Sequence, residues 1–187
     1  NKHKISSIID EIDNMAEMMN DVLQLSRAKH SEIELEDLQT EQTIEKITEN
    51  AKLTFGSPDS KVMIKNCPNV LADKTMMHQV FLNIINNAIK YSSKQDHPVV
   101  HIEGYEEEDR VVYRITDNGI GIPETEKHRM FKIFNRMDNA RKFKGNGIGL
   151  SIVHRIMNRI GGNVDYESTE EGTCFILTFQ NPKFVKL

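Results

Sequence analysis

Two glycine-rich turns constrain the fold of this chain more than any other feature. The first reads Asp-Asn-Gly-Ile-Gly-Ile over 117–122, and the second reads Gly-Asn-Gly-Ile-Gly-Leu over 145–150. Glycine leaves room for backbone amides to approach phosphate oxygens, and it accepts the positive φ of concave turns. The first turn follows a strand-like pattern and the second opens a helical one. Together they predict a nucleotide pocket.

Hydrophobic periodicity predicts an α+β protein. A helix is expected from 40 to about 55, a long one begins after the cap residue Asp73, and a third runs from about 147 to 160. Alternating patterns predict strands at 33–38, 62–64, 70–71, 99–105, 110–116, 164–168 and 173–179. The last four strands form two hairpins. Helices on one face of a mixed or antiparallel sheet give a two-layer α/β sandwich.

The first thirty residues predict a separate helix. Apolar residues are spaced alternately by three and four, at Ile5, Ile8, Ile12, Met15, Met19 and Val22. This seam is typical of a dimerisation helix in a bundle, although the helix could also fold back onto its own domain. The pattern breaks at 29–32, so we expect a dimerisation segment at 1–30 and a globular domain at 31–187.

Composition excludes several classes of protein. The formal net charge of -4 leaves no basic footprint for nucleic acid. The two cysteines, Cys67 and Cys174, lack the spacing of a zinc site or a disulfide framework. No apolar run approaches the roughly 20 residues of a membrane span, and no signal sequence precedes the first helix. A cytoplasmic location is expected, with membrane attachment only through segments outside this chain.

Polar residues on the long helix supply the chemistry of a nucleotide site. Asn83, Asn87 and Lys90 are separated by four and three, so they share one helix face. Asparagine oxygens are hard ligands for Mg²⁺, and lysine is a point charge for phosphate. Asp117, at a strand end, can accept a hydrogen bond from an exocyclic amine such as that of adenine. Taken alone, the pattern of Asn83, Asn87 and Lys90 is more typical of a solvated helix face, and Asp-Asn-Gly is also a common reverse turn, so the patterns carry weight only in combination.

The glycine turns fit neither of two common nucleotide motifs. The second turn lacks the Lys-Ser/Thr of a P-loop, and no parallel βαβ unit follows it. In order and spacing, the motifs instead resemble the Bergerat fold shared by DNA gyrase, related chaperones, mismatch-repair ATPases and sensor histidine kinases. The kinase branch is the most similar, with 83–91 as its N box, 131–134 as its F box, and 117–122 and 145–150 as its glycine boxes.

The resemblance implies the ATP-binding residues. Asp117 would read the adenine amine with help from Thr173, Asn87 would bind Mg²⁺ with Asn83 beside it, and Lys90 would meet a phosphate. The segment 135–144 would be a mobile lid, with Phe134 packed at its base. The full implied set is Asn83, Asn87, Lys90, Tyr91, Asp117, Gly119, Gly121, Ile122, Phe134, Arg136, Lys144, Gly145, Gly147, Gly149, Leu150 and Thr173.

One position separates the kinase branch from the ATPase branch. Gyrase-type relatives carry a glutamate one helical turn before the metal-binding asparagine, where it activates water. Asn83 stands there in this chain, and an amide cannot accept a proton near neutral pH. The resemblance therefore implies transfer of the γ-phosphoryl group of ATP to a protein histidine, for relay to the receiver domain of a response regulator.

The phosphoryl acceptor is not identified in this chain. None of the seven histidines has the family's sequence context, and His3 is only the nearest by position. We therefore expect a homodimer-forming kinase fragment that cannot phosphorylate itself alone. Two alternatives stay open, namely a non-catalytic ATP-sensing or scaffold module of the same fold and an anti-sigma-type serine kinase.

Overall fold

A computed structural model of the chain describes residues 12, 15–16, 18–20, 22–23, 26, 32–169 and 171–181. Its helices are α2 (Thr40–Thr54), α3 (Lys74–Ser92) and α4 (Gly149–Arg159), with two short 3₁₀ helices, η1 (Glu124–Arg129) and η2 (Asp138–Ala140). Its strands are β1 (Leu35–Leu38), β2 (Lys61–Lys65), β3 (Val70–Asp73), β4 (Val99–Glu106), β5 (Arg110–Asp117), β6 (Asn163–Thr169) and β7 (Gly172–Gln180).

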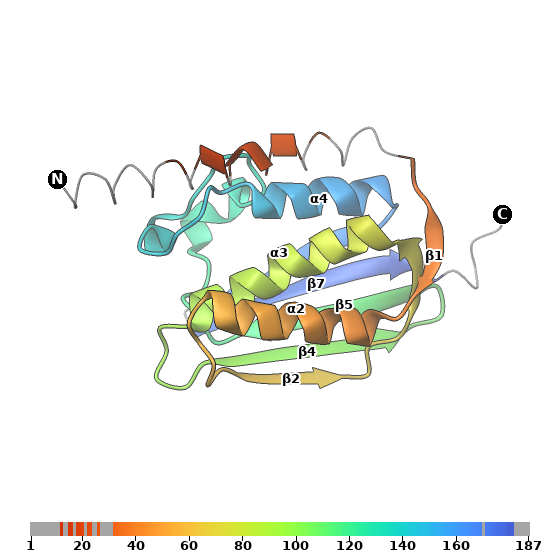
Figure 1. Ribbon diagram of the computed structural model, residues 1–187, viewed down its shortest axis with the longest axis horizontal. Helices are drawn as coiled ribbons and strands as arrows, with labels where there is room; N and C mark the ends of the chain where they lie inside the picture. Colours follow the sequence, from red (N-terminus) through yellow and green to blue (C-terminus); the bar gives the residue numbers. More distant parts are fainter. Residues whose placement is uncertain are drawn as a thin grey trace.

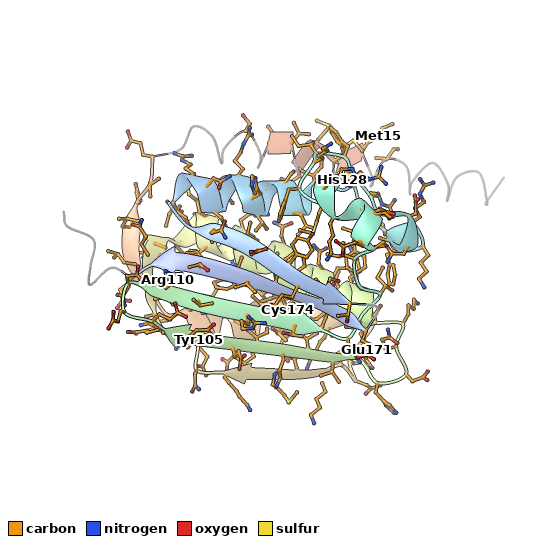
Figure 2. The ribbon with its side chains drawn as sticks, turned by 180° about the vertical axis from the view of Figure 1, so that it is seen from behind. Met15, Tyr105, Arg110, His128, Glu171 and Cys174 are labelled. Carbon is orange, nitrogen blue, oxygen red and sulfur yellow. The ribbon has the colours of Figure 1, made fainter. Side chains whose placement is uncertain are left out.

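The predicted α+β sandwich is confirmed. Five strands form a mixed sheet in the order β2-β4-β5-β7-β6, in which β2 and β4 are parallel and the other neighbours antiparallel. Strands β1 and β3 make a separate antiparallel pair. Helices α2, α3 and α4 lie over one face of the large sheet (Figure 1), and Figure 2 shows the sheet from the opposite side. Each helix buries an apolar stripe against that layer.

Helix α3 is the element that positions the site. The Asp73 carboxylate caps its first turn by accepting a hydrogen bond from the Met76 N–H at 2.9 Å, as the sequence predicts. Its inward stripe is fully buried, with Val80, Ile84 and Ile85 at 0% exposure. Because that stripe fixes the rotation of the helix, the asparagines on its other face point away from the core.

The sheet side of the core is organised around Tyr113 on β5, which is 0% exposed. Its ring packs edge-on against Phe81 of α3, with ring centroids 5.2 Å apart, and also against Phe179 of β7. Its hydroxyl donates to the carbonyl oxygen of Pro68. This single side chain therefore joins α3, the sheet and the connection between β2 and β3.

The strands expected at 62–64 and 70–71 exist, and they belong to different sheets, because β2 pairs with β4 and β3 pairs with β1. One local expectation needs correction. Helix α4 begins at Gly149, two residues after the expected start. Gly147 has φ +71°, which is incompatible with a right-handed helix. An added Cβ there would lie 2.5 Å from the Asn135 carbonyl oxygen, so the chain must turn before the helix begins.

The described residues between 12 and 26 are helical and lie on the α4 side of the domain (Figure 1). Six apolar side chains there are between 40% and 67% exposed, namely Ile12, Met15, Met18, Met19, Val22 and Leu23. Ile5, Ile8, His3 and the expected boundary at 29–31 lie outside the described residues. Over the described part of the chain, no helix is long and apolar enough to cross a membrane. The division at residue 30 stays a prediction.

Candidate functional site

A cavity of about 290 Å³ opens between α3, the two glycine turns and the segment that joins η1 to α4. Most of the sequence-predicted site residues line it: Asn83, Asn87, Lys90, Tyr91, Asp117, Gly121, Ile122, Arg136, Gly145, Gly147, Gly149, Leu150 and Thr173. Three others, Gly119, Phe134 and Lys144, are not among its lining residues. Sequence reasoning missed the remaining wall: Asn20, Asn86, Ile120, Met130, Asn135, Met137, Ala140, Asn146, Ile148 and Phe175.

Asp117 defines one end of the cavity. The residue is 6% exposed, and its carboxylate accepts the Gly119 N–H at 2.8 Å and a hydrogen bond from the backbone of Thr173. Burial raises the pKa of this carboxyl to about 7, although the two backbone hydrogen bonds act in the opposite direction. When it ionises, the carboxylate has free lone pairs with which to accept an amine N–H.

The β6–β7 hairpin holds the first glycine turn beside Asp117. The Ser168 hydroxyl oxygen accepts the Ile122 N–H at 2.8 Å and lies 3.0 Å from the Gly172 carbonyl oxygen, to which it donates. Gly121 has φ +63°, and an added Cβ would overlap the Thr169 carbonyl oxygen. Ser168 is thus a structural support of the site that no sequence pattern distinguished from the rest of its strand.

Lys90 lines the cavity beside the second glycine turn. Burial, and secondarily the charge of Arg136, lower the pKa of its ammonium group to about 8. Its Nζ lies 4.4 Å from the centroid of the Tyr91 ring and 3.4 Å from the position a Cβ of Gly145 would take. A half-buried ammonium beside the second glycine turn is suited to a phosphate, because an anion would restore the charged form.

Asn83 and Asn87 also line the cavity, and each carries an amide oxygen. The Asn83 Nδ2 donates to the Gln79 carbonyl at 2.8 Å, which turns its Oδ1 toward the start of α4. A Cβ on Gly149 would lie 2.5 Å from that oxygen. The described residues contain no group of three or more His, Cys, Asp or Glu side chains that could hold a metal ion. Neutral oxygens fit a Mg²⁺ ion that takes its anionic ligands from phosphates.

The lid differs from its expected arrangement. Phe134 is 57% exposed with φ +61°, so the prediction that it packs at the lid base is wrong. Phe143 is the lid residue that packs on the cavity wall, edge-on against Tyr91 with ring centroids 5.2 Å apart. The Arg136 guanidinium donates to the carbonyls of Ala140 at 3.2 Å, Arg141 at 3.3 Å and Phe143. Arg136 therefore stabilises the lid through hydrogen bonds to the lid's own backbone.

A family model described as "Histidine kinase-, DNA gyrase B-, and HSP90-like ATPase" matches residues 72–183, which include both ends of this cavity. The chain belongs to this family. Within it, the chain carries a catalytic ATP-binding domain of the sensor histidine kinase type, so the family and the Bergerat-type fold expected from the sequence are confirmed.

Similar proteins of this ATPase family are longer than the chain. The circadian input-output histidine kinase CikA of Synechococcus elongatus is 29% identical over 181 residues, which cover 91% of this chain and 24% of CikA. The sensor histidine kinase WalK of Bacillus subtilis is 33% identical over 178 residues, which cover 90% of this chain and 29% of WalK. The chain thus spans only about a quarter of the length of these curated relatives.

A solved structure shares the fold. Full-length ShkA, crystallised in complex with AMPPNP, superposes with a TM-score of 0.78 at 23% sequence identity. The match covers 95% of this chain and 38% of that one. At this identity, the likeness establishes the arrangement of the elements.

Proposed function

We propose that this chain is the catalytic region of a two-component sensor histidine kinase, preceded at 1–30 by part of a dimerisation region. It binds Mg-ATP and transfers the γ-phosphoryl group to a histidine of the dimerisation region, for relay to an aspartate of a response-regulator receiver domain. The full-length protein forms a homodimer through the N-terminal helix, and this region works in the cytoplasm. One observation carries the proposal: a single cavity joins the buried Asp117 carboxylate to Lys90 and the second glycine turn.

The residues divide the nucleotide between the two ends. The Asp117 carboxylate accepts the adenine amine beside Thr173, while Lys90 and the backbone amides at the start of α4 receive phosphates. Asn87, with Asn83 beside it, holds Mg²⁺, which neutralises charge that develops on the transferred group. This assignment uses each polar feature of the cavity for a ligand atom of matching chemistry.

The cavity favours transfer to a protein over hydrolysis. Asp117 is the only carboxylate among the described residues that line it, and hydrogen bonds from the Gly119 and Thr173 backbones hold it beside the first glycine turn. Asn83 cannot act as a base toward water. Without a base near the phosphates, the terminal phosphoryl group is protected from water until a nucleophile arrives from another segment. None of the described histidines lines the cavity, which is consistent with an acceptor outside it.

Phosphoryl transfer in trans tests the proposal. The chain is mixed with Mg²⁺, γ-labelled ATP and a longer version of the protein that includes the histidine-bearing helix of the proposed dimerisation region. The longer version carries Asp117→Asn, so that label on it must come from the intact chain. Acid-labile, alkali-stable label on the longer protein is the expected result. No label with nucleotide binding intact would favour an ATP-sensing or scaffold module, and acid-stable label would indicate a serine kinase.

A further inference from the structure

The base of the lid is fastened to the first glycine turn by one side chain. Asn139 lies in η2, and its Nδ2 donates to the carbonyl oxygens of Ile120 at 3.2 Å and Gly121 at 3.1 Å. The Oδ1 of the same amide is buried without a hydrogen-bond partner. Rotating the amide by half a turn would set this oxygen against two carbonyl oxygens, so the side chain acts here only as a donor.

A second contact fixes the same short helix from the other side. The Glu126 carboxylate, on η1, accepts the Asp138 N–H at 3.2 Å and pairs with Arg129 at 3.4 Å. Glu126 is 6% exposed, so this carboxylate is shielded from competing water. η2 is therefore held by Glu126 at its first residue and by Asn139 at its second.

The outer part of the lid and the start of the second glycine turn, together residues 141–146, are held in a different way. The Arg136 guanidinium donates to the carbonyls of Arg141 and Phe143, and also to that of Ala140 at the end of η2. The Phe143 ring packs on Tyr91. Arg136 and Tyr91 both line the cavity, so the phosphates or the adenine ring of a bound nucleotide can compete for their contacts. The contacts of Asn139 reach the backbone of the first glycine turn instead, and Asn139 itself is not a lining residue.

The first glycine turn lies beside Asp117 in the cavity wall. The lid contributes Arg136 and Asn135 to the wall of the same cavity. Asn139 thus connects the part of the proposed site that holds the adenine ring with the lid, which closes over the phosphates. We propose that Asn139 is a positioning residue that fixes the lid base at 137–140 to the first glycine turn, so that lid movement is confined to 141–146. This inference rests on the proposed nucleotide site.

Two substitutions at this position test the anchor. Asn139→Asp keeps the shape but cannot donate to carbonyls, and Asn139→Ala removes the side chain without adding charge. Asn158→Ala, at an exposed position of α4, is the matched control. Hydrogen exchange of the ligand-free proteins should show faster exchange at 137–140 in both Asn139 variants, by about tenfold, with β5 and β7 unchanged. Unchanged exchange at 137–140, or an increase spread over the whole domain, would overturn the proposal.

Nucleotide affinity supplies a readout that loss of stability alone would not move. Both Asn139 variants should bind ADP about five- to tenfold more weakly, the effect of one neutral hydrogen bond, while adenosine affinity stays near that of the control. An equal loss for ADP and adenosine would contradict a role in placing the lid. If the unaltered protein binds neither compound, the proposed function fails, and the exchange experiment alone decides whether the anchor exists.

Discussion

Adenosine binding should strengthen by about tenfold between about pH 6 and pH 8, because the ionised Asp117 carboxylate is the form that accepts the amine. Burial raises the pKa of this carboxyl to about 7. The ionised fraction then rises from about one tenth to about nine tenths over this range, and the apparent association constant rises in proportion. Adenosine is the right probe because phosphate groups of nucleotides titrate in the same range.

The same shift has a consequence for stability. The unfolded carboxyl ionises near its ordinary value of 3.8, while the native one ionises near 7, so the native state binds one more proton between them. The free energy of unfolding therefore falls as pH rises through this window, by up to about 4 kcal/mol. Asp117→Asn should remove that loss. At pH values above 7, the variant should therefore unfold at a higher urea concentration than the unaltered protein, although it binds adenosine more weakly.

Isothermal titration calorimetry at a series of pH values measures how adenosine affinity depends on pH. Repeating the titrations in buffers of different ionisation enthalpy measures the proton release that accompanies binding. About half a proton should leave the protein at pH 7 when adenosine binds. Asp117→Asn is the control and should show weak, pH-independent affinity. Constant affinity of the unaltered protein across the range, with no proton release, would refute the assignment of the adenine amine to Asp117.

Three further predictions concern single side chains. Gly121→Ala should destabilise the domain by at least about 2 kcal/mol more than Gly56→Ala in urea unfolding, since both glycines have φ near +60° but only Gly121 lies against a neighbouring backbone; equal losses would contradict this packing. Tyr113→Phe should cost about 1 kcal/mol of stability through the lost bond to Pro68, with ADP affinity unchanged; a thermal melt and an ADP titration check this. Lys90→Met should weaken ADP binding at least about tenfold and leave adenosine binding intact, because a charged hydrogen bond is lost; a parallel loss for adenosine would place Lys90 elsewhere.

The sequence predicted those structural features that depend on local patterns of residues. Alternating apolar residues located the strands, and the Asp73 cap located the start of α3. The spacing of Asn83, Asn87 and Lys90 placed all three on one helix face, and all three line the cavity. These features follow from backbone periodicity, which acts within a few residues of sequence.

Features that depend on distant partners were not predictable. Alternation in β2 and β3 gives no information about which strand each one joins, so their separate sheets became visible only in three dimensions. Phe134 was assigned by resemblance, but packing on Tyr91 selected Phe143 instead. Asn139 and Ser168 bond to backbone atoms of segments far along the chain, and a lone polar residue carries no signal of such a contact.

The most direct test of the nucleotide site is a calorimetric titration of the unaltered chain with AMPPNP and Mg²⁺, run beside Asp117→Asn and Asn87→Ala. Saturable binding to one site is expected, severely weakened in Asp117→Asn, while Asn87→Ala should lose mainly the increment that Mg²⁺ adds. Equal affinity in all three proteins, or no binding by the unaltered chain, would contradict the assignment of this cavity to ATP.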